Sequence, residues 1–186
     1  MKLRWGIVVL GFCAVIDWPA AAQTLKEQMP KLLPWSQQIA VREGWLVKRH
    51  ALLLDMMRRH KVAMWIVVNE EFHDDPLTEY IAPPRPYTGN RDFFVVVDTG
   101  ERGLKKIAIT GYSQESVGRF FEKSNVAQPD IAQELRALWD TYHPAQIALG
   151  IDGKRGVTRS LTRSSYDYLV ASMGPEAAAH FVPAED

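Results

Sequence analysis

The sequence predicts an α/β fold: a mixed β-sheet of about five to six strands flanked by helices. Amphipathic helical segments alternate with short apolar runs along most of the chain. Two of these runs, 92–98 and 106–110, are joined by a connection so short that they must pair antiparallel. The chain has 186 residues, of which 47% are hydrophobic and 24% charged, and this composition is typical of one globular domain.

Residues 42–79 form the unit around which the remaining elements are organised. A helix comes first, and the apolar side chains that recur along it predict one buried stripe, made of Trp45, Leu52, Leu53, Met56 and Met57. The run 62–68 then predicts a central strand that is apolar on both faces. Ligands usually bind at the carboxyl ends of such strands, so we look for a site there first.

The segments after this unit are assigned in order. Pro83, Pro84, Pro86 and Gly89 exclude regular structure between 76 and 90. The predicted elements that follow are a hairpin (92–98 and 106–110), a short helix from 113 or 114 to 121, a helix over 129–142, a strand over 146–152, a helix over 160–174 and a last strand within 178–186.

Residues 1–22 have the three regions of a secretory signal peptide. Lys2 and Arg4 precede the apolar stretch 7–16, and small residues follow it. A membrane-spanning helix would need about 20 apolar residues, and Asp17 ends this stretch early. We therefore expect an exported protein, periplasmic or secreted, that has no stable membrane anchor.

The predicted organisation continues with a leader or linker over 23–41 and the α/β domain over 42–186. Cys13, the one cysteine, lies in the signal peptide, so the mature chain would have no thiol for a disulfide or a metal site. The sequence stops within its last predicted strand. We therefore expect it to be truncated from a longer protein.

An acidic loop follows the central strand and is the most reactive segment by composition: Glu70, Glu71, His73, Asp74 and Asp75. Carboxylate and imidazole groups could bind a divalent metal or act as an acid/base pair. However, their spacing matches neither a zinc helix nor a calcium loop. The favoured interpretation is a solvated loop whose carboxylates cap the following turn.

Three further residues are possible ligand or interface positions. Arg85 and Tyr87 belong to the proline-rich loop and could face a ligand or a neighbouring subunit. Asp152 ends a predicted buried strand, although an Asp-Gly pair more commonly begins a turn.

No motif assigns a catalytic, metal-binding or cofactor-binding residue. The sequence lacks the GxSxG, SxxK, GxGxxG and P-loop patterns. His50 and His60 are interpreted as surface histidines, and His180 has no obvious partner. Ser164 and Ser165 are interpreted as exposed polar positions on a helix.

Several stretches follow one another in a fixed order: RxxxLLxMMxxHKVAMWIVVNEE, DPLTEYIAP, RDFFVVVD, KKIAITGY, HPAQIALGID, SYDYLVASMG and AAHFVPAED. In this order they resemble the amino-terminal domain of the creatinase/aminopeptidase P family, the pita-bread metallopeptidases, and in particular its exported, proline-peptidase-like members. The resemblance covers most of 42–186 and implies a creatinase-type amino-terminal domain with ribonuclease H-like layering.

In that family the amino-terminal domain cleaves no bond. A following domain binds two divalent metals through two aspartates, one histidine and two glutamates, and it hydrolyses the bond before proline. The resemblance implies no cofactor in this chain and no catalytic residue that can be transferred to it. It implies that the domain shapes access to the site and contributes subunit contacts.

The expected function is therefore that of a non-catalytic amino-terminal domain of an exported Xaa-Pro aminopeptidase-like metallopeptidase. Its partners would be the metallopeptidase domain or a second subunit, together with the peptide substrate. The formal net charge of zero gives no indication of a nucleic-acid partner. Two alternatives remain: a free-standing cell-envelope binding module for a cation or small peptide, which would use the acidic loop and Asp152, and a metal hydrolase built on His73.

Overall fold

The computed structural model describes residues 31–73, 75–84, 88–111, 115–124, 130–152 and 161–184. The chain divides into two units, Met1–Pro34 and Trp35–Asp186. In the first unit the described residues, 31–34, are exposed and have no regular secondary structure. The predicted signal peptide lies outside the described residues.

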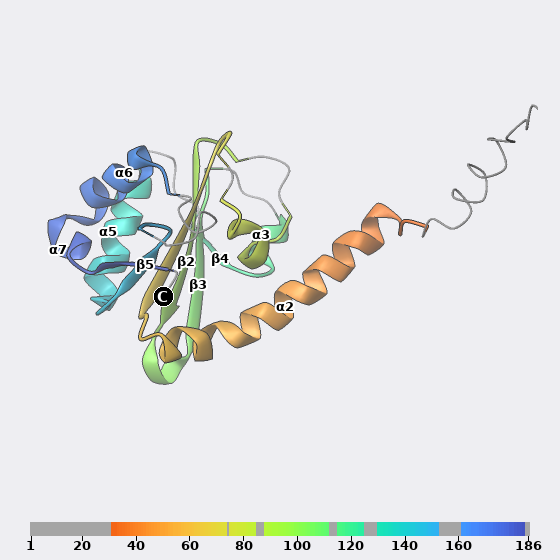
Figure 1. Cartoon of the computed structure of the whole chain (residues 1–186), viewed down its shortest axis with the longest axis horizontal. Coiled ribbons are helices and arrows are strands. Elements are labelled where there is room, and N and C mark those ends of the chain that lie inside the picture. The colour runs from red at the N-terminus through yellow and green to blue at the C-terminus, as the bar shows by residue number, and fades with distance from the viewer. Residues whose placement is uncertain are drawn as a thin grey trace, which may run out of the picture. The chain divides into compact units, whose positions relative to one another are not determined.

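A six-stranded mixed sheet of order β4-β3-β2-β1-β5-β6 forms the centre of the second unit (Figure 1). Its strands are β1 (Met64–Glu70), β2 (Arg91–Asp98), β3 (Leu104–Ile109), β4 (Glu122–Ser124), β5 (Ile147–Leu149) and β6 (Phe181–Pro183). The pairs β1–β2 and β2–β3 are antiparallel, whereas β1–β5, β5–β6 and β3–β4 are parallel. The predicted α/β class with a mixed sheet is confirmed, and so is the antiparallel hairpin.

Helices cover both faces of the sheet (Figure 1). They are α2 (Trp35–Arg59), α3 (Thr78–Ile81), α4 (Glu115–Gly118), α5 (Ile131–Tyr142), α6 (Arg163–Met173) and α7 (Pro175–Ala178), with a short 3-10 turn, η1, at Gly100–Arg102. Helices α5, α6 and α7 pack on one face. Helices α2, α3 and α4 pack on the other, so the sheet is the middle layer of three.

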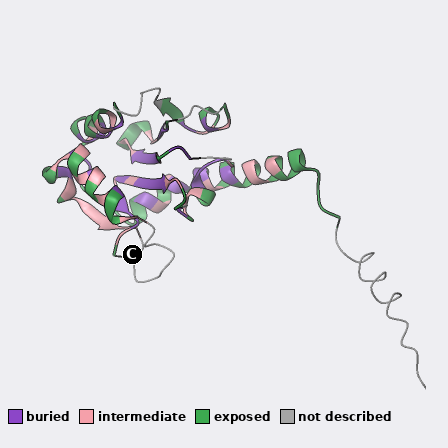
Figure 2. Ribbon diagram, turned by 90° about the horizontal axis from the view of Figure 1, so that it is seen from above, coloured by how far each residue is buried: buried purple, intermediate pink, exposed green. Residues whose placement is uncertain are grey.

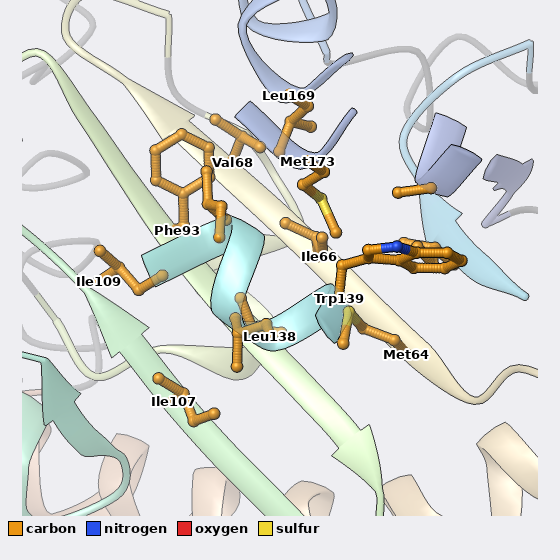
Figure 3. Close-up of a cluster of buried hydrophobic side chains, with 14 of the residues drawn as sticks. Met64, Ile66, Val68, Phe93, Ile107, Ile109, Leu138, Trp139, Leu169 and Met173 are labelled. Carbon is orange, nitrogen blue, oxygen red and sulfur yellow. The ribbon is translucent and has the colours of Figure 1, made fainter. Parts of the chain in front are cut away.

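The main core lies between the sheet and helices α5 and α6 (Figure 3). On β1, Met64, Ile66 and Val68 face this core, while Val67 joins the cluster on the opposite face. Successive residues of a strand point to opposite faces, so a strand covered on both sides must be apolar at nearly every position. Figure 2 shows this burial, and it explains the uninterrupted apolar runs in the sequence.

Helix α2 buries a different stripe from the predicted one. Its buried residues are spaced four, three and four apart and are Leu46, His50, Leu53 and Met57. Trp45 and Leu52, predicted to be buried, are 55% and 65% exposed. The prediction was wrong for these two residues because the helix carries two apolar lines, and the one that contains a histidine is the one that meets the sheet.

Helix α2 also begins earlier than the predicted domain boundary at residue 42. Residues 35–41, assigned from the sequence to the leader, are helical. Trp35 at the start of the helix is 72% exposed. The amino-terminal half of α2 extends beyond the sheet, whereas its carboxyl-terminal half packs on it (Figure 1).

The prediction that 76–90 has no regular structure was wrong at its start, because helix α3 occupies Thr78–Ile81, before the first of the prolines at 83–86. The short helix α7 was not predicted, and most other elements differ from prediction in length. Helix α5 matches closely and ends at Tyr142, and its C-cap is His143, a left-handed residue with φ of 39°. Strand β5 is shorter than predicted, and β4, at one edge of the sheet, was not predicted. His180 has a partner, because its Nδ1 lies 3.0 Å from the carbonyl oxygen of Ala145.

His50, predicted to lie on the surface, is 8% exposed. Its Nε2 lies 2.7 Å from the carbonyl oxygen of Ile81, and its Nδ1 lies 2.8 Å from Nζ of Lys106. A carbonyl only accepts, so Nε2 carries the proton and Nδ1 accepts from the lysine ammonium. Burial lowers the pKa of His50, and the charge of Lys106 adds to this, although the bond to Ile81 acts in the opposite direction.

This lowered pKa predicts a pH dependence of stability. In the unfolded chain His50 titrates near the ordinary histidine pKa of 6.5, whereas in the folded chain it takes up a proton only at lower pH. The unfolded state therefore binds more protons between these two values. We expect the contribution of His50 to be complete above pH 6.5 and to be lost as the pH falls toward the lowered pKa.

Urea unfolding over this pH range tests the prediction. The substitution His50→Gln should flatten the decline in unfolding free energy on acidification, because glutamine does not titrate. The exposed His60 gives a matched control, and His60→Gln should keep the wild-type decline. Equal declines in the two variants would contradict the assignment.

Candidate functional site

The carboxyl end of β1 lies beside the start of helix α6. Strands β1 and β5 run parallel, so their carboxyl ends lie at the same end of the sheet. Glu70 is the last residue of β1 and is paired in register with Arg91, the first residue of β2. These two residues meet the amino terminus of α6 in what we call the Glu70 cluster, which consists of Glu70, Arg91, Thr162, Ser164 and Ser165.

One carboxylate oxygen of Glu70 accepts three hydrogen bonds. Oε1 accepts from the hydroxyl of Ser165, from Oγ1 of Thr162 at 2.9 Å and from Nε of Arg91 at 3.2 Å. Thr162 is also the N-cap of α6, because its Oγ1 accepts from the backbone N–H of Ser165 at 3.1 Å. The cluster therefore joins β1, β2 and the first turn of α6.

The hydrogen bonds keep Glu70 ionised. Burial alone would raise the pKa of its carboxyl group, but the bonds from Ser165, Thr162 and Arg91, with the charge of Arg91, outweigh burial and lower it. The carboxylate also lies at the amino terminus of α6, where the helix dipole stabilises negative charge. A carboxylate with a lowered pKa is a poor general acid at neutral pH.

Arg91 extends the cluster along α6. Its Nε donates to Oγ of Ser165 at 2.9 Å, and its terminal nitrogen donates to Oγ of Ser164 at 2.6 Å. The guanidinium carbon also lies 5.0 Å from the ring centroid of Tyr168, in cation-π geometry. Ser165 is fully buried, so its predicted exposure was wrong, whereas Ser164 is exposed as predicted.

Asn69 points to the face opposite Glu70 and fixes the acidic loop. Its Nδ2 donates to Oγ1 of Thr88 at 2.7 Å, and its Oδ1 accepts from the backbone N–H of Asp75 at 2.9 Å. Asp75 is 4% exposed, and its Oδ1 accepts from the backbone N–H of Leu77 at 2.8 Å. Asp75 therefore caps the turn that follows, as the favoured interpretation of the loop predicts, but it is buried and not solvated.

The other predicted acidic-loop residues do not converge on one point. The backbone N–H of Glu71 donates to Asn90 at 2.9 Å, and the exposed His73 donates its backbone N–H to Glu70 at 3.1 Å. Within the described ranges no group of three or more His, Cys, Asp or Glu residues is placed to hold a metal ion. The predicted positions Asp74, Arg85 and Tyr87 lie outside the described residues.

Asp152 follows β5 at the same end of the sheet as Glu70, but it takes no part in the hydrogen bonds to the Glu70 carboxylate. It is exposed and has a φ of 50°, as in a turn. A cavity of about 560 Å³ lies beside it and is also lined by Leu161, Thr162 and Tyr166. Asp152 therefore borders a hollow that Thr162 connects to the Glu70 cluster.

A second, mostly apolar cavity of about 600 Å³ lies on the α2 face of the sheet. Its lining includes Met57 of α2, Trp65 of β1, Ala148 of β5 and Val182 of β6. The two cavities thus flank the sheet at different places. Of the two, only the one beside Asp152 is lined by a residue that the sequence predicted as a possible ligand position.

Sequence reasoning did not find Arg91, Thr162 or Ser165 as members of a site. A local signal exists for Thr162, because a threonine directly before a helical segment is a common N-cap. Arg91 and Ser165 give no comparable signal. Their contacts join residues far apart in the chain.

No described helix has the length and apolar character needed to cross a bilayer. Comparison of the sequence with models of known protein families gives no match, and comparison with curated proteins gives none either.

Proposed function

We propose that this chain is a non-catalytic amino-terminal domain of an exported Xaa-Pro aminopeptidase-like metallopeptidase. In this role it shapes substrate access and makes subunit contacts, while a metallopeptidase domain that holds two divalent metals performs hydrolysis. Its partners are that domain or a second subunit, and the peptide substrate. The domain itself holds no cofactor, and the protein works in the periplasm or outside the cell.

The arrangement of strands supports this proposal. The sequence stretches that resemble the creatinase/aminopeptidase P amino-terminal domain correspond to β1, β2, β3, β5, α6 and β6. These strands form a continuous sheet in the order β3-β2-β1-β5-β6, with the hairpin antiparallel and the last strands parallel. Such an arrangement agrees with the ribonuclease H-like layering that the resemblance implies.

The environment of Glu70 is the observation that carries the proposal. Glu70 ends the central strand, where chemistry would be sought first. Its Oε1 accepts from Ser165, Thr162 and Arg91, and its pKa is lowered. A carboxylate bound in this way holds secondary-structure elements together. It is poorly placed to activate a water molecule.

Peptide hydrolysis by the chain alone tests the non-catalytic part of the proposal. Purified chain, supplied with Mn²⁺ and an Xaa-Pro peptide, should show no turnover above a buffer control. The variants Glu70→Gln and His73→Ala should give the same result. Turnover that persists after contaminating proteases are removed, and that disappears in either variant, would overturn the proposal.

A chimera tests the accessory role. We expect that replacing the amino-terminal domain of an exported Xaa-Pro aminopeptidase with residues 35–186 of this chain retains Xaa-Pro hydrolysis. An unrelated α/β domain of similar size is the control and should not support hydrolysis. Equal activities in the two chimeras would contradict a specific accessory role.

The cavity beside Asp152 favours a second candidate function, a free-standing cell-envelope module that binds a cation or small peptide. Asp152, Thr162 and Tyr166 supply polar groups around about 560 Å³, a volume suited to a small ligand. Calorimetric titration with Ca²⁺, Mn²⁺ and a basic peptide distinguishes the candidates. Heat that is lost in Asp152→Asn would favour the binding module, and the absence of heat would remove it.

A further inference from the structure

Helix α2 carries a second apolar line, and this line is largely exposed. Val41, Trp45 and Leu52 are 41%, 55% and 65% exposed. They are separated by four and seven residues, so they return to nearly the same side of the helix. This side is turned away from the buried residues of α2, and the part of the helix beyond the sheet carries exposed and intermediate residues (Figure 2).

Cations are interleaved with this apolar line. Lys48 lies between Trp45 and Leu52 along the same side, and Arg59 follows Leu52 by seven residues. We call these residues the α2 stripe: Val41, Trp45, Lys48, Leu52 and Arg59. Arg58 pairs with Asp98, and Glu43 pairs with Arg119, whereas Lys48 and Arg59 form no ion pair within the described part of the chain.

The charge around the α2 stripe is positive overall. Arg42 and Arg49 flank it on one side, and Asp55 is the carboxylate that flanks it on the other. A complementary surface must therefore accept apolar side chains and carry negative charge. This combination excludes a purely apolar protein groove as a good match, since Lys48 would be buried there without a partner.

Two simple pairings of α2 with a second copy of the chain place like charges together. If two α2 helices pair antiparallel with Trp45 on Leu52 of the other copy, the two Lys48 side chains lie beside each other. In a parallel pair each residue faces its own counterpart, so the two lysines again meet. Both arrangements bring like charges together, which destabilises a helix pair.

An anionic lipid surface matches both properties of the stripe. Interfacial helices place Trp and Leu at the boundary between headgroups and acyl chains, and their lysine and arginine side chains reach lipid phosphates. Anionic lipids attract such cations at close range. We propose that the α2 stripe lies on an anionic membrane surface, with Trp45 and Leu52 at the acyl boundary and Lys48 and Arg59 at the phosphates.

Spin labels at two matched positions test this proposal in the full chain. Cys13 is the one cysteine, so Cys13→Ser gives a background for single labels. Leu52→Cys places a nitroxide on the stripe. Val47→Cys places one on another side of the same helix, at a residue that is 58% exposed. If another part of the chain bound the vesicle, both labels would be brought to it equally. A difference between the two labels therefore reports which side of α2 contacts the membrane.

The measurement is the access of oxygen and of a water-soluble nickel chelate to each label. On vesicles that contain phosphatidylglycerol, the label at 52 should gain access to oxygen and lose access to the chelate, while the label at 47 stays in water. This difference in access between the two labels should disappear on vesicles of pure phosphatidylcholine. It should also disappear on phosphatidylglycerol vesicles when Lys48→Glu is introduced. The matched reversal Arg163→Glu, on a helix at the opposite face of the sheet, should leave it unchanged.

Three results would overturn the proposal. The label at 52 could stay in water on both kinds of vesicle, as it would if an acidic protein were the partner. It could report the same environment as the label at 47. Spin–spin broadening at 52 without vesicles would identify a second copy as the occupant.

Discussion

Replacing Glu70 with alanine is expected to lower the free energy of unfolding by about 2–4 kcal/mol. The substitution removes the acceptor of three hydrogen bonds and leaves the fully buried hydroxyl of Ser165 and the guanidinium of Arg91 without it. Leaving a buried donor without its charged acceptor costs more unfolding free energy than the net contribution of the hydrogen bond. Urea unfolding followed by circular dichroism measures the change.

An exposed carboxylate gives the matched control for Glu70. Glu122 lies 3.0 Å from Lys105, and its side chain is 67% exposed, so Glu122→Ala should cost less than about 1 kcal/mol. The lowered pKa of Glu70 adds a pH test. Its contribution should be present above pH 4.5, the ordinary pKa of a glutamate side chain, and be lost as the pH falls through the lowered pKa. Equal losses for the two variants would contradict the structural role of the cluster.

Phe93→Ala is expected to have the largest effect on stability, a loss of about 3–5 kcal/mol in the free energy of unfolding. Phe93 is fully buried on β2, and its ring lies 5.9 Å from that of Tyr168 on α6. The substitution leaves a cavity in the main core that rigid neighbouring strands fill only partly. Thermal and urea unfolding both measure the loss.

Phe72 provides a control of the same residue type. It is 96% exposed, so Phe72→Ala should change the unfolding free energy by no more than about 0.5 kcal/mol. The contrast between the two phenylalanines tests the assignment of the main core. A loss for Phe93→Ala that is as small as that for Phe72→Ala would contradict the packing of α6 on β2.

The fold was predictable where burial determines the residue pattern. Strands β1 and β2 are covered on both faces, which requires the uninterrupted apolar runs seen in the sequence. The short connection between Asp98 and Leu104 determined the antiparallel hairpin. Strand β4 has no such pattern, because its residues Glu122 and Lys123 lie exposed at a sheet edge.

The buried stripe of α2 was not predictable from its own residues. Trp45 and Leu52 are more apolar than His50, so hydrophobicity alone selects the wrong line. His50 is buried because Ile81 supplies an acceptor and Lys106 a donor, and both are distant in the chain. Tertiary partners therefore decided which of two possible helix faces meets the sheet.

The candidate site was predictable in its location but not in its membership. The end of β1 follows from the strand assignment, and Glu70 follows from that. The partners Thr162 and Ser165 lie 92 and 95 residues further along the chain. No local spacing encodes a contact across that separation, and a pair of serines on a helix resembles an ordinary solvated surface.

The edge position of β6 has a consequence for self-association. The backbone N–H of Ala184 donates to the carbonyl of Leu149, and the carbonyl of His180 accepts from the N–H of Ile147. The backbone groups of the even-numbered residues of β6 therefore point toward β5, and the backbone of Pro183 points away from the sheet. Proline has no N–H to offer an incoming strand. This margin of the sheet therefore blocks the regular addition of further strands, and with it one route to fibrils.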